Sequence, residues 1–307
     1  MTALKALTND LTKLCKSRKI VSNLVDGLLP VLLGLRVAYL VDCMDMDEQV
    51  AVKIVAVLRK HSGNESIMAL VLSAGDRYMD QTFIVNESIY RTEYGDDGYV
   101  SPILATLPAL YRVEGVAKDY LLRRMSAALN TCLATANMDG SSVAVHPLEK
   151  SSQDPQPPVP ELCTEGERAC SAPVPSVAIA GWLLGYPVIY WPTEGESSAL
   201  VLSGAQLRVW HVGVRKRGEE SVAMQWSCPE WLHTATEAGH DSTRLVVWEE
   251  LDRRHTEIGE RWRRKIGELE NGCWELRVLE EWTGRNGRGE EGVILGNENR
   301  VQYGINL

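Results

Sequence analysis

The sequence predicts a protein of the mixed α/β (α+β) class, with a β-α-β unit in its first half and a largely antiparallel second half. In the first half, short apolar runs rich in β-branched residues alternate with segments of helical periodicity, which is typical of β-α-β units. In the second half, apolar runs are separated by short charged turns, as in antiparallel hairpins. With 45% hydrophobic and 24% charged residues, the composition excludes collagen-like, coiled-coil and wholly disordered proteins.

The first elements are predicted from spacing and from capping residues. Leucines recur at helical intervals from Leu4 to Leu14, which indicates an amphipathic opening helix. Ser22 can cap a second helix that runs to Leu29. The segment from Arg36 to Cys43 is apolar and β-branched and ends in charge, so it predicts a buried strand.

A helix and a second strand follow. Asp45 or Asp47 can cap a helix over Glu48 to Lys60, and Ile67 to Ser73 is the next apolar run. Together with the first strand, these elements have the length of a right-handed β-α-β crossover. The remaining elements predicted for the first half are a strand over Thr82–Asn86 and a helix over Ala117–Ala136.

In the second half, the charged turn RKRGEE joins a strand over Leu207–Val214 to a strand over Val222–Trp226 and predicts a hairpin. A short helix over Val177–Leu184, closed by Gly185, precedes these strands. The other predicted elements are strands over Pro187–Trp191 and Ala199–Leu202 and helices over Pro229–Ala238 and Arg244–Arg264.

Four segments describe the expected organisation, although 307 residues favour about two domains by length alone. Residues 1–139 and 176–264 are predicted to be the two halves of one α/β domain. Residues 140–175 are rich in Pro, Ser, Glu and Gln and predict a disordered insertion, a flexible loop. Residues 265–307 keep no sustained apolar period and predict a poorly structured tail, either a polar extension or the product of an unusual exon.

Charge and cysteine usage limit the partners and the compartment. The formal net charge of −9 argues against binding to nucleic acid or to an anionic membrane, which requires a basic face. Neither a signal peptide nor about 20 uninterrupted apolar residues is visible. Seven scattered cysteines are not a disulfide framework, which indicates a reducing compartment. The sequence therefore predicts a cytoplasmic or nuclear protein with no membrane partner.

Acidic residues gather after the first predicted strand, where open α/β sheets place their ligands. Asp42 and Asp45, followed by Asp47 and Glu48, are candidates for catalysis and for holding Mg²⁺, with Asp97 as a further metal ligand. The alternative interpretation is a solvated helix start, where acidic residues are favoured near the positive end of the helix dipole.

The segment YLVDCMDMD also resembles the first motif of haloacid-dehalogenase-type phosphatases. The run IMALVLS, which ends at Ser73, is similar to the second motif of these enzymes, and Gly95, Asp96 and Asp97 are similar to their last, acidic motif. The resemblance implies Mg²⁺-dependent phosphate hydrolysis at Asp42 and Asp45. The sequence departs from the family because no clear lysine precedes the last acidic pair on a helix.

Other cofactor sites have weaker patterns. The grouping of Cys228, His233 and His240, and the pair Cys163 and Cys170, lack the spacings of zinc sites. Phosphate-binding glycine motifs are absent from the sequence. The sequence thus predicts no cofactor, with Mg²⁺ as the alternative.

Aromatic residues concentrate on the predicted strands of the second half, with Trp182, Trp191, Trp210 and Trp226 among them. A place in the core is the favoured interpretation. The alternative is a protein-binding face, because exposed tryptophan and tyrosine mark such surfaces.

Four segments resemble an uncharacterised vertebrate family, which is known by a human chromosome 1 open-reading-frame name and a domain-of-unknown-function label. They are LLPVLLGLRVAYLVDCMDMDE, IMALVLSAGDRYMDQTFIVN, IAGWLLGYPVIYWP and LRVWHVGV. The resemblance extends from about Leu14 to Glu250 and implies a cytosolic or nuclear α/β protein. It carries over no functional residue.

Two classes of function follow from the sequence. The favoured class is a non-enzymatic protein-interaction module that binds protein partners through the aromatic strands or the Pro-rich loop. The alternative is a Mg²⁺-dependent phosphohydrolase-like enzyme that uses the acidic cluster at Asp42 and Asp45.

Overall fold

The computed structural model divides the chain into two compact units, which are described separately below. The first unit comprises Met1–Tyr99 and Glu114–Trp191, and the second comprises Val100–Val113 and Pro192–Leu307. The boundary therefore does not follow the predicted insertion at 140–175. The structure describes residues 2–15, 17–73, 80–94, 102–107, 112–113, 115–147, 174–192, 207–216, 219–229, 251, 253–254, 256–262, 264, 274–285 and 291–294.

Three helices open the first unit: α1 (Thr2–Cys15), α2 (Arg18–Leu32) and α3 (Glu48–Ser62). The Asp47 side chain caps α3 by accepting from the Val50 N–H at 2.8 Å, and Gly63 closes this helix at a φ of 66°. The prediction that Ser22 caps α2 is wrong. Ser17 is the cap, and its hydroxyl accepts from the Ile20 N–H at 3.4 Å, which places Ser22 inside the helix.

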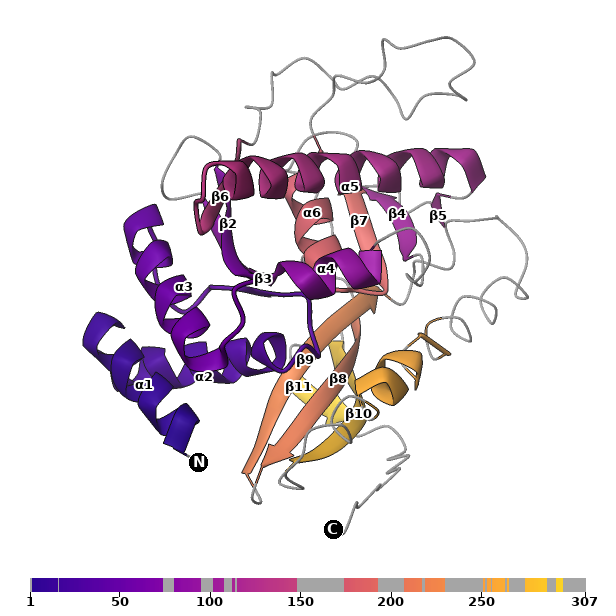
Figure 1. The fold of residues 1–307 in the computed structure, drawn as a ribbon. Helices are drawn as coiled ribbons and strands as arrows, with labels where there is room; N and C mark the ends of the chain where they lie inside the picture. Colours follow the sequence, from indigo (N-terminus) through magenta and orange to yellow (C-terminus); the bar gives the residue numbers. More distant parts are fainter. Residues whose placement is uncertain are drawn as a thin grey trace, which may run out of the picture. The chain divides into compact units, whose positions relative to one another are not determined.

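A four-stranded sheet follows, with strand order β1-β3-β2-β6 (Figure 1). Its strands are β1 (Ala38–Leu40), β2 (Ile67–Ser73), β3 (Gln81–Asn86) and β6 (Val143–Pro147). β3 pairs antiparallel with both β1 and β2, so β1 and β2 are parallel but not adjacent. The predicted β-α-β unit is therefore split, because β3 folds back beside β2 and occupies the place next to it.

β6 corrects the expected start of the flexible loop at residue 140. This strand pairs parallel with β2, and the Ala69 N–H donates to the Ser142 carbonyl at 2.9 Å. Val143 and Ala144 are buried, so residues 143–147 belong to the sheet and begin in the core. The rest of the predicted loop, 148–173, lies outside the described residues.

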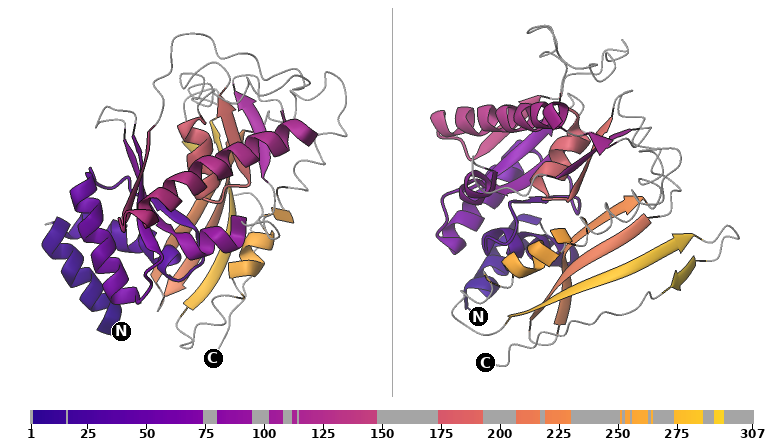
Figure 2. Two further views of the ribbon diagram at one scale, coloured as in Figure 1. Left: turned by 45° about the horizontal axis from the view of Figure 1, so that its top comes forward. Right: turned by 90° about the vertical axis from the view of Figure 1, so that its right-hand side faces the viewer.

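Helices cover both faces of this sheet. The remaining helices of the unit are α4 (Glu87–Tyr94), α5 (Gly115–Met138) and α6 (Ser176–Leu183), and β7 (Val188–Pro192) follows α6. In Figure 2, left, the sheet lies between α1 and α3 on one side and α5 on the other. The first face has one continuous core, which includes Leu11, Leu24, Leu28, Ile54, Leu58, Ile67, Ala69 and Ile84. The alternate strand residues Met68, Leu70, Leu72, Phe83 and Val85 are buried on the second face.

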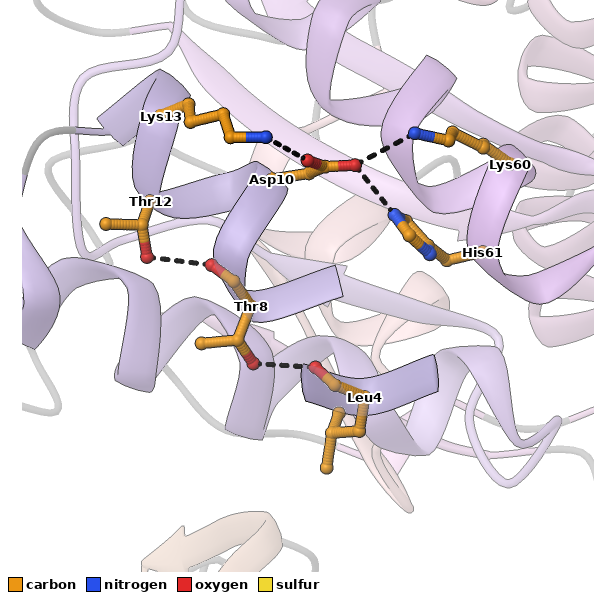
Figure 3. A network of polar contacts seen from close by, with 7 residues as sticks. All are labelled: Leu4, Thr8, Asp10, Thr12, Lys13, Lys60 and His61. Carbon is orange, nitrogen blue, oxygen red and sulfur yellow. Dashed lines mark hydrogen bonds and ion pairs between the residues drawn. The ribbon is translucent and has the colours of Figure 1, made fainter. Parts of the chain in front are cut away.

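An ion-pair network joins α1 to α3 (Figure 3). Asp10 Oδ1 accepts from Lys13 Nζ at 2.7 Å, while its Oδ2 lies 3.0 Å from both Lys60 Nζ and His61 Nε2. The hydrogen bonds from Lys13, His61 and Lys60 hold the pKa of the Asp10 carboxyl well below its ordinary value of 3.8.

The substitution Asp10→Asn is therefore expected to destabilise the protein at neutral pH. Because the folded state lowers this pKa, the stabilisation is complete above the unfolded value and is lost as the pH falls through the lower, folded one. Urea denaturation from pH 7 down to pH 2 should show that the difference in free energy of unfolding between the variant and the wild type shrinks below about pH 4. At pH 7, high salt should also reduce this difference. Asp119→Asn, at an exposed position on α5, is the control. An equal loss of stability in this variant would contradict a stabilising role of the Asp10 network.

The second unit contains an antiparallel sheet of order β11-β10-β8-β9. Its strands are β8 (Leu207–Lys216), β9 (Glu219–Pro229), β10 (Trp274–Arg285) and β11 (Glu291–Ile294). The predicted hairpin is confirmed as β8 and β9, which extend beyond the expected bounds and have an irregular register at Val212 and Gly213. β4 (Ile103–Leu107) and β5 (Arg112–Val113) form a further antiparallel pair.

The structure differs from the expectation of a poorly structured tail after residue 264. β10 pairs with β8 along its length, and β11 pairs with β10. Apolar residues at Trp274, Leu276 and Val278 occupy every second position, which is the strand signal in this segment. Just before it, all described residues from 251 to 264 are helical, as predicted, and Leu251 and Trp262 are fully buried. The strand predicted over Ala199–Leu202 and the helix predicted over Pro229–Ala238 lie outside the described residues, except for Pro229 in β9.

The mixed α/β class is thus confirmed, with helices and both parallel and antiparallel pairing. Among the described helices, not one has the length and apolar character needed to cross a membrane.

Candidate functional site

The acidic cluster lies at the end of the first sheet where the carboxyl ends of its parallel strands meet. β1, β2 and β6 run in the same direction, so Asp42 after β1 and Ser73 at the end of β2 lie at the same edge of the sheet. β1 itself is an edge strand with an antiparallel neighbour. The position therefore differs from a switch point between two adjacent parallel strands, where doubly wound sheets bind ligands.

The carboxylates of this cluster are exposed to solvent. Asp42 Oδ1 accepts from the Tyr39 hydroxyl at 3.5 Å, whereas the Asp45 side chain has no partner among the described residues. Asp47 caps α3, and Glu48 is the first residue of that helix. The helix-start interpretation thus accounts for Asp47 and Glu48.

The metal site expected at Asp42, Asp45 and Asp97 remains a prediction. Asp97 and its neighbours Gly95 and Asp96 lie outside the described residues. Within the part of the chain that is described, no three His, Cys, Asp or Glu side chains come together to hold a metal ion.

Sulfur-containing side chains gather beside the acidic cluster. Cys15 Sγ, at the end of α1, lies 3.9 Å from Met44 Sδ in the segment between β1 and α3. Burial raises the pKa of Cys15, and the nearby Cys43 raises it further. Burial also raises the pKa of Cys43, against the hydrogen bond from Tyr39, which favours its thiolate. This group is not visible in the sequence, because Cys15 and Met44 are 29 positions apart.

A second thiol pairs with a histidine on the other face of the sheet. Cys132 Sγ on α5 lies 3.1 Å from His146 Nδ1 on β6. Burial raises the pKa of Cys132 and lowers that of His146, so both effects favour the neutral thiol and the neutral imidazole. The contact is therefore a hydrogen bond between neutral groups, which fastens α5 to β6.

β6 is the outermost strand of its sheet, and its outer edge is only partly satisfied. Residues 142, 144 and 146 direct their backbone groups toward β2, so Val143, Val145 and Pro147 direct theirs away from it. The Ser141 hydroxyl accepts from the Val143 N–H at 3.1 Å and donates to its carbonyl at 2.9 Å. Among the described residues, no hydrogen bond is formed by the outward backbone groups of Val145, whose side chain is 47% exposed.

The tryptophans of the second half are core residues wherever their side chains are described. Trp182, Trp191 and Trp226 are 2–5% exposed, so they cannot form the alternative protein-binding face. Trp262, which lies in the helical residues before β10, is fully buried. Of the weak zinc candidates, Cys228 is fully buried, and Cys163, Cys170, His233 and His240 lie outside the described residues.

Comparison with known proteins yields one similarity. No curated protein and no solved structure matches the chain. Residues 122–255 match the profile of a family described as "Domain of unknown function (DUF4504)". This segment is shorter than the Leu14–Glu250 range of the resemblance seen in the sequence, and it includes the described residues of α5 from Leu122, β6 and the β8–β9 hairpin.

Proposed function

We propose that the protein is a non-enzymatic interaction module that binds an extended peptide segment of a partner protein along the outer edge of β6. The observation that carries this proposal is the outward N–H and C=O of Val145, which have no partner among the described residues. A peptide that adds to a sheet edge forms such main-chain hydrogen bonds, while side-chain contacts select its sequence.

The neighbourhood of Val145 indicates which peptides would bind. The Val145 side chain projects on the same face of the sheet as Val143 and is 47% exposed, so it offers an apolar contact. Ser141 satisfies the edge at Val143, and Pro147 has no N–H to donate. Pairing is therefore centred on Val145, which suits a short extended segment with an apolar residue opposite it.

Removal of the outward N–H of Val145 is expected to weaken peptide binding. Peptides would first be selected from a random display library with the purified full-length protein. The substitution Val145→Pro removes the outward N–H at an edge position that tolerates proline, and should raise Kd about fivefold or more through the loss of one hydrogen bond. Isothermal calorimetry measures Kd, and amide exchange at residue 145 should slow when peptide binds.

Val145→Thr is the matched control, because threonine keeps the N–H and the β-branched shape. It should bind the selected peptides with nearly unchanged Kd. The proposal is wrong if the library yields no binder, or if Val145→Pro and Val145→Thr bind equally well.

One observation supports the alternative, a Mg²⁺-dependent phosphohydrolase. The carboxyl ends of β1 and β2 share one edge of the sheet, which brings Asp42 and Ser73 to the same side. Under this alternative, Mg²⁺ should raise the melting temperature, and Asp42→Asn should abolish that gain, because the ion prefers carboxylate oxygen ligands. Ca²⁺ and the exposed α5 substitution Asp119→Asn are the controls. The alternative is contradicted by a melting temperature that does not respond to Mg²⁺.

A further inference from the structure

The sulfur atoms beside the acidic cluster have the arrangement of a soft-metal site that is distinct from the β6 edge. Cys15 comes from the end of α1, and Cys43 and Met44 come from the segment that connects β1 to α3. All three are partly buried and pack against the core of α1, α2 and α3. Two thiols and one thioether from different elements therefore pack against one core.

The separation of the Cys15 and Met44 sulfur atoms suits a shared ion. Two sulfur ligands at metal–sulfur distances of about 2.3 Å lie about 3.8 Å apart in tetrahedral geometry and about 4.0 Å apart in trigonal geometry. Cys15 Sγ and Met44 Sδ are 3.9 Å apart. Cys43 precedes Met44 directly in the chain and packs against the same core as Cys15. Cys15 and Met44 can thus hold one ion at their present separation, with the Cys43 thiol as the third ligand.

The chemistry of the three ligands selects the ion. Thiolate and thioether sulfur favour soft Cu(I), whereas carboxylate and water oxygen suit Mg²⁺. Structural Zn²⁺ sites use four thiolate, imidazole or carboxylate ligands, and a thioether is not among them. We propose that Cys15, Cys43 and Met44 form a Cu(I)-binding site.

Tyr39 is a positioning residue for this site. Its hydroxyl donates to Asp42 Oδ1 at 3.5 Å and acts to lower the pKa of Cys43, while burial raises the pKa of Tyr39 itself, so it remains a donor. A donor next to a thiolate ligand orients the ligand and stabilises its charge. Binding exchanges protons for metal: one Cu⁺ displaces one proton from each thiol, so two protons are released and the oxidation state is unchanged.

The test is an anaerobic titration of the reduced, full-length protein with Cu(I), in competition with a chromophoric chelator. One tightly bound equivalent is expected, with two protons released per ion below the pKa of the thiols. The substitutions Cys15→Ser, Cys43→Ser and Met44→Leu should each raise the Kd for this Cu(I) ion by more than about 100-fold, because each removes a ligand. Tyr39→Phe should weaken it by about 10-fold to 100-fold, the range for residues that support a ligand.

Cys132→Ser is the control, because it removes a thiol on the opposite face of the sheet and should leave the tight equivalent unchanged. Circular dichroism checks that each variant folds. Met44→Leu is decisive because leucine preserves the apolar packing and removes only the thioether. Tight binding that survives in Met44→Leu or in both serine variants would overturn the proposal and would show that the sulfur contact serves packing alone.

Discussion

Replacement of Asn86 by alanine is expected to lower the free energy of unfolding by about 2–3 kcal/mol. Asn86 is 2% exposed and is the last residue of β3. Its Oδ1 accepts from the Ile89 N–H at 3.3 Å at the start of α4, and its Nδ2 donates to the Val31 carbonyl at 3.1 Å near the end of α2. One side chain at the end of β3 thus joins the start of one helix to the end of another.

Both contributions can be estimated separately. Loss of a helix cap costs about 1 kcal/mol. Loss of the buried hydrogen bond to Val31 costs about a further 1 kcal/mol, since that carbonyl keeps one donor, the Gly34 N–H at 3.1 Å. The cavity left by the missing side chain adds to the loss of stability from these two contacts.

Asp47→Ala is the matched control, because Asp47 caps α3 from an exposed position and its side chain forms no other hydrogen bond within the described part of the chain. It should cost about 1 kcal/mol. Urea denaturation of both variants and of the wild type gives the comparison. Equal losses in the two variants would show that the contact of Asn86 with Val31 contributes nothing to stability.

Gly27→Ala is expected to destabilise the protein by about 2 kcal/mol, although alanine is a better helix former than glycine. A Cβ at position 27 in α2 would lie 2.1 Å from Cε2 and 2.3 Å from Cζ of the Tyr39 ring on β1. Overpacking of this kind costs up to about 3 kcal/mol, while the gain in helix propensity is about 1 kcal/mol. Displacement of the ring would also move the hydroxyl that donates to Asp42.

The sign of this effect should reverse when the ring is absent. In a Tyr39→Ala background, Gly27→Ala should stabilise the protein by about 1 kcal/mol, because only the helix propensity remains. Thermal and urea denaturation of the four proteins in this double-mutant cycle measure the coupling. An effect of Gly27→Ala that is the same in both backgrounds would contradict the close packing of Gly27 against Tyr39.

Elements with strong local signals were predictable from the sequence. Helix α3 begins after the carboxylate of Asp47 and ends at the glycine at position 63. The leucine spacing identifies α1, and the apolar stripe identifies α5. The β8–β9 hairpin follows in the same way, since its turn joins two adjacent strands. These signals act within a few residues, so each is readable before the chain is folded.

Strand order was not predictable, because it depends on competition between distant segments. β2 has β3 on one side and β6 on the other, and β6 lies about 70 positions further along the chain. β6 has only five residues and adjoins a Pro-rich segment, so its pairing with β2 is not visible locally. The same holds for β10, which pairs with β8 across a long separation.

The candidate sites divide along the same line. The acidic cluster at Asp42 and Asp45 is contiguous in sequence, so it was found from the sequence, as was the alternative that Asp47 starts a helix. The sulfur group and the open edge at Val145 became visible only after folding, since each joins or exposes residues from separate elements.

Residue type and spacing alone were enough to establish the mixed α/β class and most of the helices and strands described, because capping and periodicity are short-range effects. Folding in three dimensions decided which strands are neighbours, which edge stays open and which thiols meet a thioether. Those outcomes depend on burial and on pairing between distant segments. Burial and pairing favour a single arrangement of the strands only when the whole core is assembled.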